Sequence, residues 1–447
     1  MSPWRAKAKM WMKAMMISSL KLRGLLVGMV TQPAAIVLAR SSGLHQVLLE
    51  IVQKRKPLDD LTLHGLLSER DGDIARLVQA ILDSDEQMGH ALKLEGEEAN
   101  SLMVVLQRVL DRVDDFQSYC PEGFRFAAHG LLIRLSRHYD SLPSSLFVSG
   151  LELPSLDPVA GGGFADILRG QLGQVVVAVK RLRRVFSSPE DQIYIRKLLY
   201  REALIWKGLD HPYVLQFLGV ASDVTSGSIC LVSPWMVHGD MMTYLASRGS
   251  LGVSVNELLF QVASGLLFLH SKDIIHGDLR GRNILIGSDH SSRIADFGLA
   301  IVADRKAAWS TKGSGSTRWM APELLFPNML GIPFQRTFPT DVYAYACVCL
   351  EVYTEAPPFS SVPTDAELIL QILKGLELEK PPASQCRGRV MPHFLWMLMK
   401  LCWNRSPDQR PTIRRVVASI SKHPQRGFGN ILRHRHVIFI SSIVALI

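Results

Sequence analysis

Three polar side chains at fixed spacing predict phosphoryl-transfer chemistry near the middle of the chain. The stretch His276–Asn283 has the sequence HGDLRGRN, and an Asp-Phe-Gly tripeptide beginning at Asp296 follows it. The carboxylate of Asp278 can orient a hydroxyl nucleophile and take its proton. The amide oxygen of Asn283 and the carboxylate of Asp296 can hold magnesium ions on the phosphates of a nucleotide. Other elements must then supply a phosphate-binding loop and a cation.

A glycine-rich segment upstream fits the first of these needs. Three glycines follow Ala160, between two strand-like runs. Glycine lets backbone N–H groups approach phosphates without interference from a Cβ atom. A dinucleotide-binding loop is disfavoured, because a strand follows the glycines and not a helix. Taken alone, such a run more often forms a simple turn, so this signal depends on what surrounds it.

The cation is predicted to be Lys180, which ends a Val-Ala-Val-Lys strand. An unpaired ammonium group at the end of a buried strand is costly, so it needs a partner. Glu202, on the helix that follows, is the candidate partner. Either residue alone would more often be a solvated surface charge. As a pair after a glycine loop, they can hold an ammonium group against a phosphate.

The order of secondary-structure patterns predicts an α+β fold with a β-rich lobe followed by an α-rich lobe. The strand-like and glycine-broken part runs from Leu151 to Leu182, and a helix is expected from about Pro189 to Lys207. Two further strands are expected at Val214–Val220 and Ile229–Pro234. After Asp240, helical patterns dominate, and the clearest are Val255–His270, Asp341–Tyr353 and Phe394–Cys402. A nucleotide site is expected between two such lobes.

A separate helical region is predicted before these lobes, over residues 41–140. Its clearest apolar stripe comprises Leu102, Val105, Leu106, Val109, Leu110 and Val113, at helix spacing. The pair Asn100-Ser101 predicts a helix boundary. The predicted domains are thus a basic and apolar N-terminal segment (1–40), the helical region (41–140), the two-lobed domain (147–422) and a basic, then apolar tail (423–447).

Composition excludes some classes of function. The net charge is +9 over 447 residues. Basic and aromatic residues do not interleave in runs, so nucleic-acid binding is not expected. The six cysteines show neither metal-ligand spacing nor a disulfide framework, which favours free thiols in an intracellular setting. The apolar stretches Leu25–Leu38 and Val437–Ile447 fall short of the about 20 residues that span a bilayer. We expect terminal segments there, with targeting or peripheral membrane attachment as the alternative.

In combination, these motifs resemble the eukaryotic protein kinase family from about Phe147 to Lys422. The resemblance implies ATP and Mg²⁺ as cofactors, Asp278 as the catalytic base, Arg280 near the γ-phosphate, Asn283 and Asp296 on magnesium, and Glu202 as the anchor of Lys180. It further implies an ion pair between Glu323 and Arg410, and support of the catalytic loop by Asp341. The residues that it places around ATP are Ala160, Gly161, Gly162, Gly163, Phe164, Ala165, Ile167, Ala178, Lys180, Ser233, Trp235 and Met236.

The detailed sequences of the motifs resemble those of the tyrosine-kinase-like branch, and of kinases common in mushroom-forming fungi. The motifs that carry the likeness to the branch are His211-Pro212, the stretch from Arg318 to Glu323, and Cys402-Trp403. The likeness to the fungal kinases rests on all motifs together, including Pro158–Phe164 and His276–Asp278. Gly315-Ser316 resembles the Gly-Thr of serine/threonine kinases, so we expect a serine or threonine acceptor. Arg280 stands where those enzymes usually have lysine, which leaves tyrosine as an alternative acceptor.

Departures from the kinase pattern leave two functional hypotheses. Ala160 and Ala165 replace glycines of the phosphate loop, and Gly277 replaces the arginine that usually precedes the catalytic Asp. That arginine can bind an activation-loop phosphate in relatives, so we do not expect phosphorylation of Ser310 or Thr311 to be the on-switch. The first hypothesis is an active kinase with a protein substrate. The alternative is a pseudokinase or scaffold whose helical region binds a protein partner.

Overall fold

The computed structural model describes residues 33–36, 38–39, 74–113, 120–121, 123–161, 165–182, 189–222, 229–248, 253–302, 317–327, 333–376 and 379–422. The chain divides into two compact units, Met1–Phe147 and Val148–Ile447. Residues 1–32, residues 40–73, which include the start of the predicted helical region, and residues 423–447 lie outside the described residues. So do Gly162, Gly163 and Phe164, and the stretch that contains Ser310 and Thr311.

The described part of the first unit is helical, as expected. A helix covers residues 74–82, followed by α4 (Asp85–Ala91), α5 (Gly96–Arg112), α6 (Phe124–Tyr139) and the short 3-10 helix η3 (Ser144–Leu146). Every member of the predicted apolar stripe on α5 is buried. The boundary predicted at Asn100-Ser101 is wrong, because both residues lie inside α5. The Asn100 amide instead accepts a hydrogen bond from the Ser144 N–H at 2.9 Å, so its side chain is satisfied without ending the helix.

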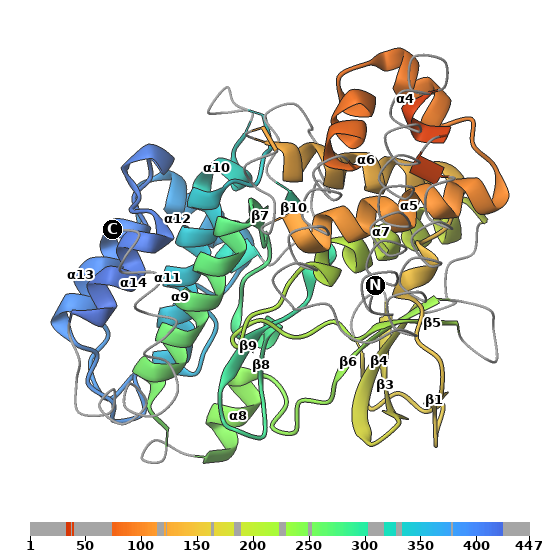
Figure 1. Ribbon diagram of the computed structural model, residues 1–447. Helices are drawn as coiled ribbons and strands as arrows, with labels where there is room; N and C mark the ends of the chain where they lie inside the picture. Colours follow the sequence, from red (N-terminus) through yellow and green to blue (C-terminus); the bar gives the residue numbers. More distant parts are fainter. Residues whose placement is uncertain are drawn as a thin grey trace, which may run out of the picture. The chain divides into compact units, whose positions relative to one another are not determined.

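The second unit begins with a six-stranded sheet. Its strands are β1 (Leu151–Glu152), β2 (Ala160–Gly161), β3 (Ala165–Leu172), β4 (Val175–Leu182), β5 (Gly219–Ser222) and β6 (Ile229–Pro234). The order is β1-β3-β4-β6-β5, with β2 also paired to β3 (Figure 1). Gly173 turns β3 into β4 at a φ of 58°, a conformation that glycine adopts without a Cβ clash. The apolar side chains of Val177 and Val179 alternate into a core with Leu168.

One predicted strand is shorter and displaced. Val214–Val220 was expected to be a strand, but β5 begins at Gly219. Val214 forms an isolated parallel bridge with Ile294, and the Leu215 N–H donates to the Ile294 carbonyl at 2.8 Å. The apolar side chains are buried as a strand would require, yet the backbone pairs with a neighbouring segment before it joins the sheet.

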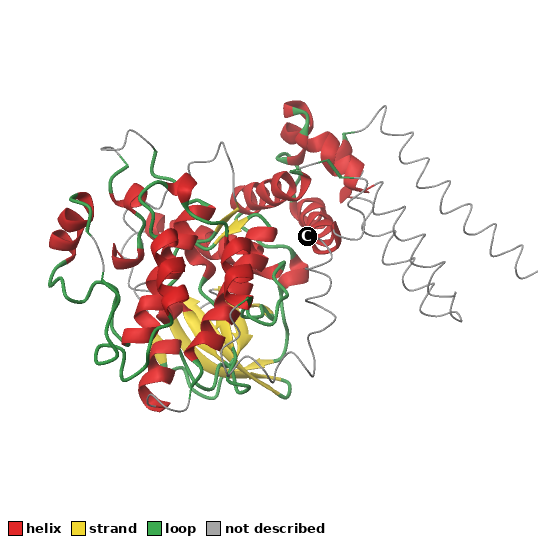
Figure 2. Ribbon diagram, turned by 90° about the vertical axis from the view of Figure 1, so that its left-hand side faces the viewer, coloured by secondary structure: helices red, strands yellow, loops and turns green. Residues whose placement is uncertain are grey.

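Helices dominate the rest of the second unit, as Figure 2 shows in red beside the yellow sheet. The predicted helices are confirmed as α7 (Pro189–Lys207), α9 (Val255–Ser271), α11 (Phe338–Thr354) and α13 (His393–Cys402). The other helices are α8 (Met241–Arg248), α10 (Pro322–Leu325), α12 (Asp365–Leu373) and α14 (Ile413–Ser421), with 3-10 helices at Gly281–Asn283, Phe297–Leu299, Thr317–Trp319 and Pro407–Gln409. Short strand pairs join β8 (Ile284–Ile286) to β9 (Ser292–Ile294), and β10 (Ile301–Val302) to β7 (Ile274–Ile275). The predicted order of a β-rich and then an α-rich lobe, after a helical region, is therefore confirmed.

Two further expectations concern the cysteines and the membrane. The six cysteines are thiols and form no disulfide, and five of them are buried. Burial raises the pKa of the Cys402 thiol to about 12, which keeps that thiol protonated and unreactive. Among the described residues, no helix is long and apolar enough to cross a bilayer.

Candidate active site

Lys180 links the sheet to the helical lobe through two carboxylates. It lies on β4, and its Nζ is 2.7 Å from Glu202 Oε1 on α7 and 3.0 Å from Asp296 Oδ1. Burial opposes the charged form of Lys180, but the carboxylates of Glu202 and Asp296 outweigh it, so the pKa of the ammonium group is raised. Lys180 therefore stays cationic, and it binds Asp296, which is 116 residues away in the chain.

Asp296 stands at a strained turn just before the 3-10 helix Phe297–Leu299. Its φ of 65° lies in the left-handed region, where aspartate is tolerated better than most residues. The Lys180 ammonium holds the pKa of the Asp296 carboxyl below its ordinary value. Phe297 is buried next to it and contacts Trp206 at a ring-centroid distance of 5.7 Å. The buried Phe297 ring fixes a turn that presents an ionised carboxylate to the sheet.

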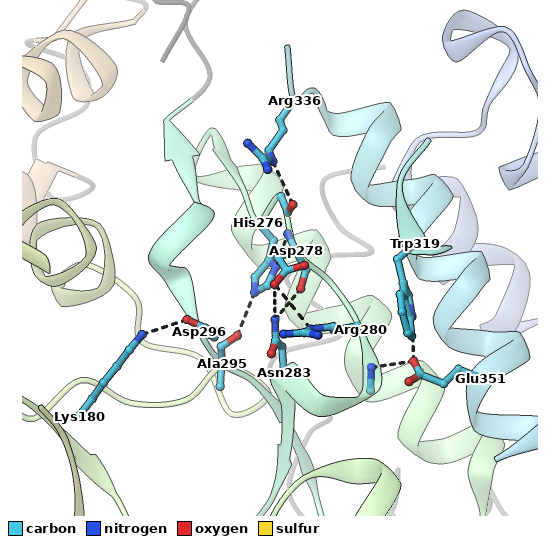
Figure 3. Close-up of polar contacts among 12 residues, drawn as sticks. Lys180, His276, Asp278, Arg280, Asn283, Ala295, Asp296, Trp319, Arg336 and Glu351 are labelled. Atoms are coloured by element: carbon cyan, nitrogen blue, oxygen red, sulfur yellow. Dashed lines mark hydrogen bonds and ion pairs between the residues drawn. The ribbon is translucent and has the colours of Figure 1, made fainter. Parts of the chain in front are cut away.

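The side chains predicted to act in the stretch His276–Asn283 lie together (Figure 3). This stretch is called the catalytic loop because of that prediction. The Asn283 Nδ2 donates to the Asp278 carbonyl at 2.8 Å and to Asp278 Oδ2 at 3.0 Å. Arg280 Nε is 3.6 Å from the same carboxylate oxygen. Burial raises the pKa of Asp278, and the Arg280 guanidinium opposes that shift. Because Asn283 turns its amide nitrogen toward Asp278, its amide oxygen is free to point elsewhere as a ligand.

The residues fit a magnesium site that is completed by phosphate. Asn283 and Asp296 offer an amide oxygen and a carboxylate, which are the hard ligands that Mg²⁺ takes. Among the described residues, no cluster of three or more His, Cys, Asp or Glu side chains could hold a metal ion by itself. Any Mg²⁺ bound here would therefore need further oxygen ligands, such as those of a nucleotide.

His276 and Asp341 fix the start of the catalytic loop. The Asp341 carboxylate on α11 accepts the N–H groups of His276 and Gly277 at 2.8 and 2.9 Å. It also lies 3.0 Å from His270 Nε2. The buried His276 ring is 3.0 Å from the Ala295 carbonyl through Nε2, and its Nδ1 accepts the Asp278 N–H at 3.2 Å. His276 thus joins the backbone of Asp278 to that of the segment that precedes Asp296.

Two anchors of the loop were missed in the sequence. Glu351 on α11 accepts the Gly281 N–H at 2.8 Å and the Trp319 Nε1–H at 2.9 Å. Arg336, just before α11, donates from Nε to the Gly277 carbonyl at 3.0 Å. An acid within the apolar run around Glu351 was a usable signal, because a buried carboxylate needs partners. Arg336 gave no such signal.

The predicted nucleotide-contacting residues that the structure describes lie on strands β2, β3, β4 and β6 or directly after β6. Ile167 on β3 pairs with Lys180 on β4, and Ala178 on β4 pairs with Ser233 on β6. Trp235 and Met236 follow β6 directly; the Trp235 N–H donates to the Val176 carbonyl at 3.0 Å. The Arg169 guanidinium lies 5.5 Å from the centre of the Trp235 ring. The sheet thus brings these residues onto adjacent strands.

The alanines that depart from the glycine-loop pattern sit in extended backbone. Ala160 is in β2 and pairs with Ile167, and Ala165 starts β3 and pairs with Leu182. Neither is among the residues with positive φ. Alanine would be strained in the left-handed region, and neither of these two alanines adopts it.

Glu351 should make stability depend on pH. Burial raises the pKa of its carboxyl from 4.5 to about 7. Between those values the folded state binds more protons than the unfolded state. The contribution of Glu351 to stability is therefore fully present below pH 4.5 and is lost as pH rises through 7. The full loss corresponds to about 3 kcal/mol. We expect Glu351→Gln to flatten the pH dependence of urea unfolding across this window. If the free energy of unfolding of Glu351→Gln depends on pH as steeply as that of the parent, Glu351 is not the source of the dependence. The control is Glu367→Gln, which makes the same change at an exposed position.

Comparisons with known proteins agree with this geometry. A family model described as "Protein tyrosine and serine/threonine kinase" matches residues 155–420, more than half of the chain. Serine/threonine/tyrosine-protein kinase HT1 of Arabidopsis thaliana is 27% identical over 60% of this chain and 65% of its own length. Tyrosine-protein kinase FRK of Homo sapiens is 29% identical over 58% and 48%. Probable serine/threonine-protein kinase drkB of Dictyostelium discoideum is 28% identical over 61% and 37%. The match thus covers less than two thirds of each of these relatives.

Proposed function

Because the chain belongs to the family of protein tyrosine and serine/threonine kinases, we propose that it is an active kinase that transfers the γ-phosphoryl group of ATP to protein hydroxyls. The observation that carries the proposal is the pairing of Lys180 with both Glu202 and Asp296, at 2.7 and 3.0 Å. This arrangement joins a phosphate-binding cation to a metal-binding carboxylate. Both must be in place for phosphoryl transfer by a protein kinase.

The proposed roles follow from the positions of the side chains. Lys180 would bind the α- and β-phosphates, held there by Glu202. Asp278 would orient the acceptor hydroxyl and take its proton, a role suited to a carboxyl whose pKa burial has raised. Arg280, close to that carboxylate, would face the γ-phosphate. Asn283 and Asp296 would hold Mg²⁺, which supplies charge stabilisation on the transferred group.

The acceptor class is part of the proposal. Relatives carry names of both serine/threonine and tyrosine kinases. We propose a serine or threonine acceptor on the basis of the Gly315-Ser316 motif, which lies outside the described residues. We also propose membership of the tyrosine-kinase-like branch, likeness to kinases of mushroom-forming fungi, an intracellular location, and a protein partner for the helical region.

The alternative is a pseudokinase that binds nucleotide or partners without efficient turnover. The replacements Ala160, Ala165 and Gly277 motivated it. The first two occupy extended strands without positive φ. Gly277 has a φ of 79°, which glycine adopts readily. These conformations favour the active enzyme, because none of the three replacements forces the backbone away from a working geometry.

Lys180→Met should separate the two hypotheses. We expect the parent chain to incorporate phosphate from ATP and Mg²⁺ into a generic protein substrate, and Lys180→Met to lose at least about 10²-fold of that activity, because an electrostatic clamp on the phosphates is gone. Thermal-shift measurements with ATP and Mg²⁺ give the binding readout. The control is Lys400→Met, an exposed lysine on α13. Stabilisation of the parent by nucleotide without phosphate incorporation would support the pseudokinase.

A further inference from the structure

Gly277 is held at both of its backbone polar groups. Its N–H donates to the Asp341 carboxylate at 2.9 Å, and its carbonyl accepts from Arg336 Nε at 3.0 Å. The neighbouring His276 N–H also donates to Asp341. The peptide groups on either side of Gly277 are therefore fixed by one anionic and one cationic side chain, immediately before Asp278.

The two side chains that hold Gly277, those of Arg336 and Asp341, belong to one short stretch at the start of α11. Arg336 precedes the N-cap residue Thr337, and Asp341 lies in the first turn of the helix. The Thr337 side chain accepts from the backbone at Thr340, and the Thr340 side chain accepts from the Thr337 N–H in return. This capping box fixes the backbone between Arg336 and Asp341. The distance from Arg336 to Asp341 is therefore set by local structure as well as by the core.

The surroundings of Arg336 suit a fixed side chain. The residue is only 2% exposed, and its guanidinium lies 5.4 Å from the centre of the Phe334 ring. Burial lowers the pKa of Arg336, while the carboxylates of Asp278 and Asp341 act in the opposite direction. The guanidinium stays charged, because arginine is protonated far above neutral pH. Figure 3 shows it reaching the loop at the end opposite Glu351.

We propose that Arg336 is a positioning residue of the catalytic loop: it holds the Gly277 carbonyl, and so the backbone that leads into Asp278, from outside the loop. This contact comes from the residue before the N-cap of α11. The loop would then be assembled by contacts within the folded lobe. This inference rests on the proposed kinase function, because positioning of Asp278 matters only if Asp278 acts in catalysis.

The first test compares the kinetics of Arg336→Ala and Arg336→Lys with those of the parent. We expect Arg336→Ala to lower kcat by about 10- to 100-fold, because small misplacement of a catalytic group has effects of this size. The KM for ATP should change less than about threefold, since Lys180 and Glu202 are untouched. The kcat of Arg336→Lys should lie between that of the parent and that of Arg336→Ala. The control is Arg405→Met, which also removes an arginine bond to a backbone carbonyl, that of Leu373, and should keep the parent kcat.

Chemical rescue distinguishes positioning from a general structural role. We expect millimolar guanidinium chloride to restore at least about fivefold of the lost kcat in Arg336→Ala, because a free guanidinium ion can donate to the vacated carbonyl. Sodium chloride and urea at the same concentrations should restore none. Guanidinium should have no such effect on Lys180→Met, whose defect lies on the sheet.

Hydrogen exchange gives a readout that does not require activity. In Arg336→Ala, we expect deuterium uptake across Lys272–Leu285 to be at least about tenfold faster than in the parent, with uptake of the sheet unchanged. An inactive parent would overturn the proposed function. An active parent together with an Arg336→Ala variant of equal kcat and equal loop exchange would overturn the inference alone. Parallel loss of ATP binding and of protection throughout the lobe would also overturn it.

Discussion

Asp278→Asn should lower kcat by about 10²- to 10⁴-fold, the range expected when a general base is removed. Asparagine has the shape of aspartate, so its side-chain oxygen can still accept from the Asn283 amide, as Asp278 Oδ2 does at 3.0 Å. It cannot accept the proton of the attacking hydroxyl. Lys180, Glu202 and Asp296 remain in place, so nucleotide binding should change by less than about threefold. The loss should therefore appear in kcat and not in KM.

The measurement is steady-state phosphate incorporation into a generic protein substrate, with ATP binding followed by thermal shift. Asp273→Asn makes the same chemical change at an exposed position five residues earlier. Asp273 has a φ of 59°, which asparagine also tolerates, so this control should behave as the parent does. If Asp278→Asn transfers phosphate as fast as the parent, the assignment of Asp278 as the base is wrong.

The parts of the site that sequence reasoning placed correctly are pairs of opposite charge. Lys180 on a buried strand needs a carboxylate, and its partner Glu202 was identifiable because an isolated buried charge is too costly. The pair of Glu323 with Arg410 came from the family resemblance, and the structure contains it. The support from Asp341 came from the family resemblance, and in the structure its carboxylate accepts the N–H groups of His276 and Gly277. Burial and charge therefore identified the partner of Lys180, whereas the other two contacts needed the resemblance.

The parts that it missed are contacts between a side chain and the backbone. Arg336 meets the Gly277 carbonyl and Glu351 meets the Gly281 N–H. Every residue has such backbone groups, so no spacing of residue types identifies the partner. The same reason explains Asn100, whose amide bonds the backbone of Ser144 in place of capping a helix. It also explains Val214, whose segment pairs with β9 although its composition is that of a sheet strand.

Arg336 and Glu351 change how the replacement at position 277 is understood. From the sequence, Gly277 meant the loss of a phosphate-binding arginine and nothing in its place. In the structure, α11 contacts the catalytic loop through Asp341 and Glu351, and Arg336 contacts it from the residue before the N-cap. A loop that is held at Gly277 and at Gly281 depends less on a phosphorylated activation segment for its conformation. This supports the expectation that activity does not depend on phosphorylation of that segment.

Breaking the buried ion pair between Glu323 and Arg410 should have the largest effect on stability. Arg410 donates to both carboxylate oxygens of Glu323, at 2.6 and 2.8 Å, and to the Pro339 and Asn404 carbonyls at 3.0 and 2.8 Å. Arg410→Met leaves the Glu323 carboxylate buried without its counter-charge. We expect the free energy of unfolding to fall by about 3–5 kcal/mol, measured by urea denaturation.

A double variant and a surface control make this prediction specific. Glu323→Gln combined with Arg410→Met removes both charges, so it should recover part of the loss, because the uncompensated carboxylate is the main cost. Arg293→Met removes an exposed pair with Asp289 and should cost less than about 1 kcal/mol. A loss below about 1 kcal/mol in Arg410→Met would mean that Glu323 finds water or another donor. The segment leading into α10 would then be held by its apolar contacts, such as those of Ala321 and Phe326 with Tyr343 and Cys347.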